Sequence, residues 1–156
     1  MVTDLLGSIL QEVARALKIP ELHPDSNNSC RIKLKEGIEI QLELDRGGNY
    51  LVLGTELGVL PGGKYRENLF KEGMKANALP YPINGTLAYS RATNNLILFE
   101  KIPIRTATGE QVASIIPLFV EKAKVWAESL RRSELPPIAQ AYTSDRQSGG
   151  MFGLKP

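Results

Sequence analysis

Apolar residues near the start of the chain recur at spacings of three and four, the repeat of an amphipathic helix. We expect this helix over residues 3–18, with Thr3 as its N-cap and Pro20 just beyond its end. Its apolar stripe consists of Leu5, Leu6, Ile9, Leu10, Val13 and Leu17. One side of this helix should therefore pack against the rest of the domain.

Residues 30–44 show a different period, because apolar residues alternate there with charged ones. Alternation of this kind predicts two half-buried strands of a hairpin. A three-residue loop that ends at Gly37 pairs Leu34 with Ile38 and keeps the apolar side chains of both strands on one face. A two-residue loop would place Leu34 opposite a glutamate. We therefore expect the longer loop, with Gly37 in a left-handed conformation.

Two later segments, Tyr50 to Leu53 and Leu96 to Phe99, are apolar on both sides of a strand. A strand of this kind must be covered on both faces. A domain of this size has few helices to provide that cover. A partner subunit or a bound polypeptide is the natural second cover.

The remaining elements alternate in the same way between the two periods. We expect a second helix over residues 64–77, a hairpin with strands at 86–90 and 96–102, and a last helix that opens at residue 108. The order is then helix, three strands, helix, two strands, helix. Because the strands come in antiparallel groups instead of alternating with helices, the fold class is α+β with an antiparallel sheet.

The last helix has a clear start and a disturbed middle. Thr108 with Gln111 three residues later forms a capping-box pattern. Pro117 should kink the helix or split it into two. From residue 136 onward the chain is rich in Pro, Gly, Ser and Gln. We interpret residues 1–135 as a single domain and 136–156 as a flexible tail.

Composition excludes several classes of protein. The 156 residues are 42% hydrophobic and 23% charged, which is typical of one globular domain. A formal charge of +2 does not indicate a nucleic-acid or membrane partner. The single Cys30 and single His23 exclude a disulfide and a His/Cys metal site. Asp4 stands where a secretion signal needs positive charge, so we expect a cytoplasmic protein.

The sharpest enzyme-like pattern is the segment Gly58 to Lys64, which nearly fits a phosphate-binding P-loop. Tyr65 stands where a Ser or Thr must reach magnesium, and Pro61 removes a backbone N–H donor. A turn that starts a helix is the simpler interpretation. No nucleophile can be assigned to His23, so we expect no catalytic residue, metal or cofactor.

The element order, the two hairpins and the tryptophan-bearing last helix resemble the class I type III secretion chaperones, the CesT/SycE-like family. The resemblance covers about residues 3 to 132. It is carried by the helix Leu5 to Leu17, the strand Ile38 to Leu44, Tyr50 to Leu53 with Gly58 to Pro61, Arg66 to Met74, Leu96 to Phe99 and Leu118 to Trp126. Asn28-Ser29-Cys30 and the tail look most like chlamydial members. The basic pI of about 8.7 departs from a family that is usually acidic.

The resemblance implies a small cytoplasmic homodimer without enzymatic activity. Members bind the N-terminal region of a secreted effector or translocation regulator in an extended, non-globular form, and they keep it competent for secretion. A heterodimer with a paralogous chaperone is also allowed. ATP is used by the secretion ATPase, which would be an indirect partner.

The resemblance also suggests two groups of contact residues, with packing inside one subunit as the alternative for each. Dimer contacts are assigned to Tyr65, Leu69, Phe70, Met74, Leu87 and Leu98. Client contacts are assigned to Leu5, Ile9, Ile32, Leu34, Leu51 and Leu53. Two other functions stay open at this point: a nucleotide-binding enzyme that uses the Gly58–Lys64 turn, and a regulatory dimerisation domain with a folded partner.

Overall fold

The computed structural model describes residues 2–35, 37–80 and 83–136. The tail predicted at 136–156 therefore lies outside the described residues, apart from Pro136. The chain forms an antiparallel sheet with three helices, in the order α1, β1, β2, β3, α2, β4, β5, α3. The predicted α+β class and element order are thus confirmed. The bounds are α1 (Val2–Leu17), β1 (Ser29–Lys33), β2 (Glu39–Leu44), β3 (Tyr50–Val59), α2 (Gly63–Asn77), β4 (Thr86–Ser90), β5 (Asn95–Pro103) and α3 (Gly109–Arg132).

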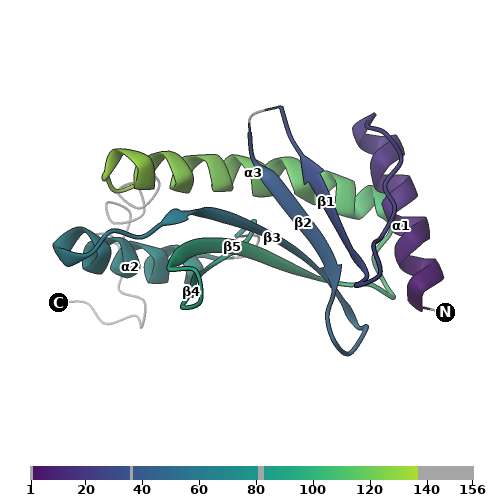
Figure 1. The fold of residues 1–156 in the computed structure, drawn as a ribbon, viewed down its shortest axis with the longest axis horizontal. Coiled ribbons are helices and arrows are strands. Elements are labelled where there is room, and N and C mark those ends of the chain that lie inside the picture. Colours follow the sequence, from purple (N-terminus) through teal and green to yellow (C-terminus); the bar gives the residue numbers. More distant parts are fainter. Residues whose placement is uncertain (1, 36, 81–82, 137–156) are drawn as a thin grey trace.

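The five strands follow the spatial order β1-β2-β3-β5-β4, with every neighbouring pair antiparallel. Helix α3 runs along the sheet and packs against β3 and β5, while α1 lies beside α3 at the β1 end (Figure 1). Helix α2 packs against β4, the opposite edge strand. This arrangement brings the first and last helices together on one layer.

The first hairpin has the predicted register. Ile32 lies opposite Ile40, and the backbone N–H of Leu34 donates to the carbonyl of Ile38 at 2.9 Å. Gly37 has φ of +83°, the left-handed conformation that the three-residue loop requires. The loop prediction was therefore correct, because only that register keeps the apolar side chains on one face.

Helix α3 begins as predicted but does not break. The Thr108 hydroxyl accepts from the Gln111 backbone N–H, and the Gln111 side chain accepts from the Thr108 N–H, so the capping box is formed. The helix then continues without interruption through Pro117 to Arg132, so the expected split is wrong. Pro117 lies on the exposed side of the helix, so its ring does not disturb the packing of α3 against the sheet.

The core lies between the helix layer and one face of the sheet. Trp126 and Phe119 of α3 are almost completely buried there. The strands contribute side chains from alternate positions, which are Ile32, Ile40, Leu42, Leu51, Leu53, Leu98 and Ile102. Helix α1 adds Leu6, Ile9, Leu10 and Val13, all at most 3% exposed. These four residues of the predicted α1 stripe therefore pack within the chain, whereas Leu5 is 36% exposed.

Lys122 connects the middle of α3 to the loop before β4 through two hydrogen bonds. Its Nζ donates to the carbonyls of Ile83 at 2.8 Å and Gly85 at 2.7 Å. Burial lowers the pKa of Lys122, while the nearby Glu100 carboxylate opposes this shift. Burial likewise raises the pKa of Glu100 above its ordinary 4.5, and Lys122 opposes the rise. The two groups thus interact electrostatically while both are partly buried.

The raised pKa of Glu100 predicts that the stability of the fold depends on pH. The folded chain holds the Glu100 proton more tightly than the unfolded chain does, so stability is lost as pH rises from about 4.5 through the raised pKa. We expect Glu100→Gln to lack this loss, so its advantage over the wild type grows across that window. Urea denaturation at a series of pH values measures it, with exposed Glu110→Gln as the control. A constant difference between Glu100→Gln and wild type would contradict the assignment.

Candidate functional site: the open face of the sheet

The face of the sheet that points away from the core carries a continuous row of exposed and half-buried side chains. On β3 the positions alternate, so that Leu51 and Leu53 are buried whereas Val52 and Gly54 are only half-buried. The register brings Val52 opposite Lys101, and Gly54 opposite Phe99. This face is therefore the second apolar side of β3 and β5 that the sequence pattern predicts.

The centre of this open face is apolar and has a depression. Val52, Ile97 and Phe99 form its half-buried apolar part. Gly54 lies among them, and a Cβ atom added to Gly54 would meet no heavy atom within 4 Å. A groove of about 840 Å³ follows these positions and is lined by strand residues, by Gly37 and Ile38 of the β1–β2 loop, and by Ala127 of α3. The glycine thus leaves space for a side chain from another polypeptide.

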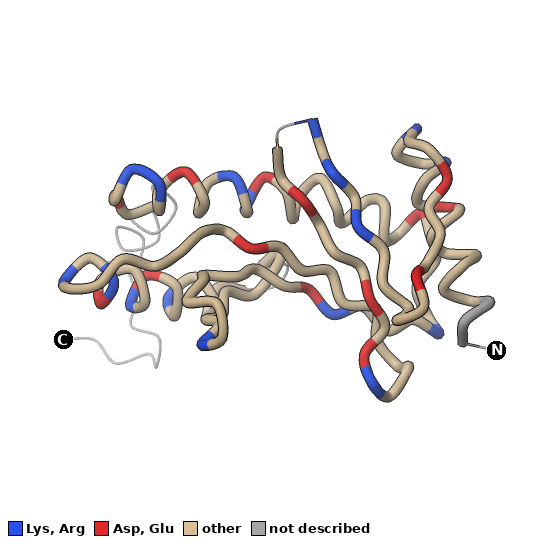
Figure 2. The backbone as a smooth tube through the Cα atoms, in the orientation of Figure 1, with Lys and Arg blue, Asp and Glu red and all other residues tan. Residues whose placement is uncertain are grey.

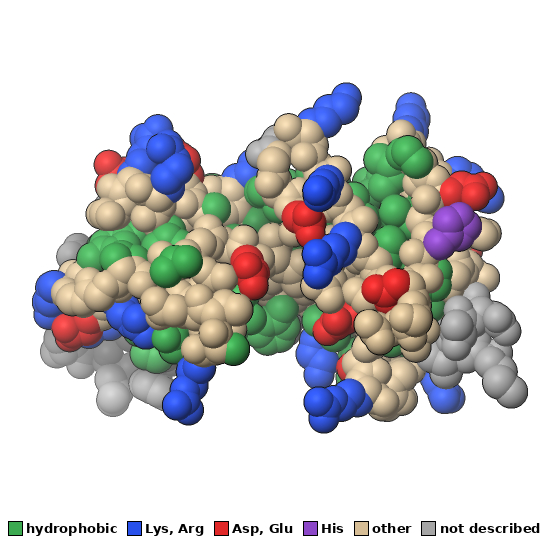
Figure 3. All heavy atoms as spheres, in the orientation of Figure 1, with side chains coloured by type: hydrophobic (Ala, Val, Ile, Leu, Met, Phe, Trp, Pro, Cys, Tyr) green, Lys and Arg blue, Asp and Glu red, His purple; other side chains and the backbone are tan. Residues whose placement is uncertain are grey.

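The border of the groove on β2 and β3 is acidic. Glu39 pairs with Arg31 at 3.4 Å and with Lys33 at 4.0 Å. Glu43 accepts a hydrogen bond from Gln41, whereas Glu56 is exposed and has no partner among the described residues. Figure 2 shows acidic positions along β2 and in the middle of β3, and Figure 3 shows acidic side chains near the centre of the face in view.

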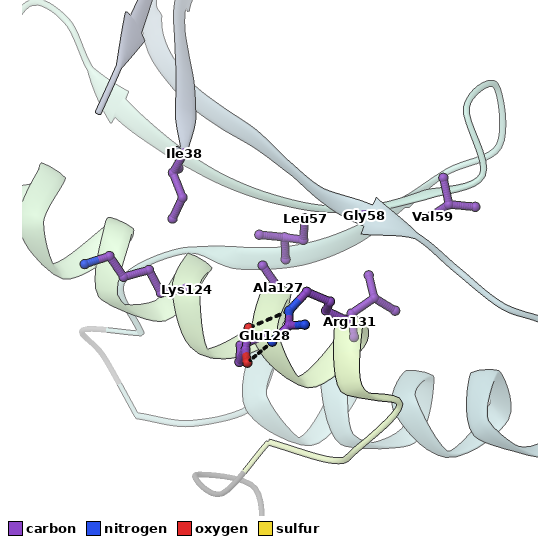
Figure 4. Close-up of a pocket in the computed structure, with 9 residues that line it drawn as sticks. Ile38, Leu57, Gly58, Val59, Lys124, Ala127, Glu128 and Arg131 are labelled. Carbon is purple, nitrogen blue, oxygen red and sulfur yellow. Dashed lines mark hydrogen bonds and ion pairs between the residues drawn. The ribbon is translucent and has the colours of Figure 1, made fainter. Parts of the chain in front are cut away.

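A second groove lies where β2 stops and β3 continues. The β2–β3 ladder ends at the pair Gln41 and Gly54, and beyond it β3 is paired with β5 alone. The space of about 650 Å³ beside this part of β3 reaches α3. In Figure 4, Ile38 points from the hairpin toward α3, and Leu57 and Ala127 face each other. The groove is therefore largely apolar where the hairpin, β3 and α3 meet.

The rim of this second groove carries an exposed ion pair with two hydrogen bonds. Arg131 donates to both carboxylate oxygens of Glu128, at 2.6 and 3.0 Å. These hydrogen bonds hold the pKa of Glu128 below its usual range. Gly58 forms the floor at a β-bulge with φ of +145°, and any Cβ there would lie 2.9 Å from Leu130. The positive φ at the bulge thus favours glycine at this position.

The residues assigned to client contact lie in two different environments. Ile9, Ile32, Leu51 and Leu53 are 0–4% exposed and belong to the core of the chain, the alternative left open by the pattern. Leu5 is 36% exposed on α1, and Leu34 is half-buried at the hairpin tip. The structure therefore leaves only these last two accessible at the surface.

The residues assigned to dimer contact also divide into buried and accessible ones. Leu69, Leu87 and Leu98 are buried inside this chain. The remaining three lie on α2, where Met74 is 66% exposed. Phe70 makes an edge-to-face contact with Tyr89, with ring centroids 5.6 Å apart.

Tyr65 is held in place by two backbone carbonyls at the end of α3. Its single hydroxyl proton is shared between the carbonyl oxygens of Ser129 at 3.0 Å and Glu134 at 2.9 Å. Burial and the Glu134 carboxylate raise the pKa of Tyr65. This residue therefore also joins α2 to α3 within one chain.

Sequence reasoning missed the residues of the open face, namely Val52, Gly54, Glu56, Ile97 and Phe99. The larger leucines of β3 were favoured as client contacts, although a strand places successive side chains on opposite faces. The signal that could have identified them is the register between β2 and β3. This register determines which positions of β3 share a face with the charged residues of β2. Applying that register would have placed Leu51 and Leu53 inside.

The Gly58–Lys64 segment does not have the geometry of a phosphate-binding loop. The strand before it, β3, is antiparallel to both neighbours. The Lys64 Nζ lies 3.4 Å from the Glu67 carboxylate of its own helix. The segment is a β-bulge followed by a turn into α2.

Among residues 2–35, 37–80 and 83–136, none of the helices combines the length and the hydropathy that a membrane span needs.

The sequence of the chain matches one known protein family. Residues 8–127 match the model of the Tir chaperone protein (CesT) family. This match spans well over half of the chain, and the chain therefore belongs to this family. No curated protein matches the chain significantly.

Several solved structures share the fold. A chain from the complex of the Yersinia pestis type III secretion chaperone SycH with a stable fragment of YscM2 has a TM-score of 0.59 and 20% identity, covering 76% of this chain and 96% of its own. The HopA1–SchA chaperone–effector complex gives 0.65 and 14%, with coverage of 80% and 94%. The heterodimeric ExoU–SpcU complex of the Pseudomonas aeruginosa type III secretion system gives 0.62 and 18%, with coverage of 78% and 97%.

Proposed function

We propose that this protein is a type III secretion chaperone that binds the N-terminal region of a secreted effector or regulator. It would hold that region in a largely extended, non-globular form and keep it competent for secretion. The observation that supports this most is the open sheet face, which combines half-buried apolar side chains with a groove of about 840 Å³ in a member of the CesT family. Complexes of related fold contain chaperones with effectors.

The proposed function needs no catalytic residue, because it consists of binding alone. Burial of apolar client side chains is worth roughly 25 cal/mol per Å² before ordering costs, so a long client segment can bind without any reaction. We infer that the protein is no enzyme, that it acts in the bacterial cytoplasm, and that it is most like chlamydial members, as Asn28-Ser29-Cys30 suggests. ATP would be used by the secretion ATPase, an indirect partner, and not by this protein.

A co-expression experiment tests this function. N-terminal fragments of candidate secreted proteins are produced together with the full chain, purified by a tag on the chaperone and treated with protease. We expect one client fragment of several tens of residues to co-purify and to resist proteolysis without showing the chemical-shift dispersion of a folded domain. If the chaperone instead bound only a compact, independently folded partner, a regulatory dimerisation domain would be the better description.

We further propose a homodimer formed through the exposed side of α2, with a paralogous chaperone as the alternative partner. Met74 is the most exposed large apolar residue described on this helix, at 66%. We expect Met74→Glu to weaken dimerisation by at least about 100-fold, because it buries a charge in the interface. Sedimentation velocity at micromolar concentration measures this.

The matched control for the dimer is Leu118→Glu, which introduces the same charge at a 52% exposed position on α3. It should leave the sedimentation coefficient unchanged. A wild-type monomer at micromolar concentration, or a dimer lost equally in both variants, would contradict an interface on α2.

A further inference from the structure

The exposed side of α2 carries an ordered pattern of charge. Its long exposed side chains follow the helical spacing of three and four, and they belong to Lys64, Glu67, Lys71 and Met74. Glu67 lies between the two lysines, with its carboxylate 3.4 Å from each Nζ. The side chains of Glu67 and Lys71 are still 55% and 58% exposed, so both remain accessible to a second molecule.

A two-fold axis would bring this stripe against its own copy. In a dimer of that symmetry, every contact from one residue to another is repeated in the reverse direction. Two α2 helices related by an axis perpendicular to them run antiparallel. If Glu67 then lies opposite the partner's Lys71, Lys71 also lies opposite the partner's Glu67. One register therefore forms two pairs of opposite charge, and the stripe is complementary to itself.

The positions of the charges on α2 distinguish this register from its alternative. An axis between Glu67 and Lys71 passes close to the middle of the helix, which spans Gly63–Asn77, so almost all of α2 faces its copy and Met74 lies over the partner helix. Pairing Lys64 with the partner's Glu67 also joins opposite charges. That axis lies near the start of α2, however, and leaves Met74 beyond the end of the partner helix. The first register buries more apolar surface and is therefore favoured.

We propose that two copies of this chain pair through antiparallel α2 helices, with Glu67 of each copy against the partner's Lys71, and that this reciprocal contact determines which partner is accepted. The inference rests on the proposed homodimer and names the residues that set its specificity. Opposite charges across an interface fix register and partner more than they add affinity. A paralogous chain that places a like charge at either position is disfavoured, so the pattern selects a second copy.

Charge reversal at either position is the first part of the test. Glu67→Lys and Lys71→Glu each replace both opposite-charge pairs with two contacts between like charges. Each variant of the full chain should therefore raise the dissociation constant of the dimer at least about tenfold in sedimentation equilibrium at about 50 mM salt. The difference from wild type should shrink at about 500 mM salt, because exposed charges are then screened.

Mixing the two variants is the decisive part. In a dimer of one Glu67→Lys chain with one Lys71→Glu chain, both contacts again join opposite charges, so the equimolar mixture should dimerise within about threefold of wild type. The double variant, which carries both substitutions in one chain, should recover in the same way as a homodimer. General damage to α2 would not be rescued by mixing. The matched control is Glu121→Lys on the exposed side of α3, also next to a lysine three residues later, which should stay within about twofold of wild type.

Single variants that dimerise as tightly as wild type would overturn the proposal, as would a mixture that stays monomeric although both chains melt like the wild type. If one single variant does not fold, the double variant decides, and a monomeric double variant that melts like the wild type would also overturn the pairing. The wild type separates the two proposals. A monomeric wild type refutes the homodimer and the pairing together, whereas a wild-type dimer that tolerates both charge reversals refutes the pairing alone.

Discussion

Replacing Phe119 with alanine is expected to lower the free energy of unfolding by about 3–5 kcal/mol, the cost of removing a large aromatic side chain from a packed core. Phe119 is 0% exposed and lies on the side of α3 that packs against the sheet. Trp126 is the single tryptophan of the chain and is 2% exposed, so its fluorescence reports unfolding in both proteins. Urea denaturation followed at that signal gives the difference directly.

The neighbouring Leu118 provides the control for this experiment. It is 52% exposed on the same helix, so Leu118→Ala should change stability by no more than about 0.5 kcal/mol. Similar losses in the two variants would mean that α3 does not dock through the Phe119 side. A large loss for Phe119 alone would confirm the face of α3 that holds the helix layer on the sheet.

The sequence pattern predicts the elements well where one face of each element is buried. The stripe of α1 and the hairpin register follow from single periods of 3.6 and 2, and a shift by one residue would expose the whole apolar set. The capping box at Thr108 is equally local, because it depends on two side chains three residues apart. These features could be predicted because neighbouring residues alone determine them.

The length of β3 could not be predicted in this way. The strand extends to Val59, although the segment from Gly54 onward contains two glycines and a glutamate and has no clear alternation. Its pairing with β5 maintains the strand through a bulge between Glu56 and Gly58. Tertiary pairing therefore overrides weak local preference, and the second groove exists because β3 extends beyond β2.

The candidate site was predicted only in outline. Excess apolar surface on β3 and β5 correctly indicates that one side of these strands is not covered by the described part of the chain. The choice between Leu51 and Val52 as the outward residue depends on the register between β2 and β3, which the alternation within β3 alone does not determine. The acidic border likewise forms only when the register of β2 brings Glu43 opposite Val52.

Lys122→Met is expected to lower the free energy of unfolding by about 3 kcal/mol, although the residue lies outside the apolar core. The substitution keeps the aliphatic part of the side chain but leaves the carbonyls of Ile83 and Gly85 without their donor. The loop cannot easily move away, because Gly85 has φ of +124° and its backbone lies against Leu98. Thermal and urea denaturation at pH 7 measure the loss.

A comparison with a surface ion pair separates this contact from simple charge attraction. Lys71 lies 3.4 Å from Glu67 on the exposed side of α2, so Lys71→Met should cost no more than about 0.5 kcal/mol. The double variant Lys122→Met with Glu100→Gln should be more stable than the sum of the two single effects predicts, since Glu100→Gln then removes a carboxylate that has lost the charge of Lys122. If the double variant instead lost the sum of both single effects, the two side chains would act independently, and the carbonyl hydrogen bonds alone would explain why Lys122 holds this loop to α3.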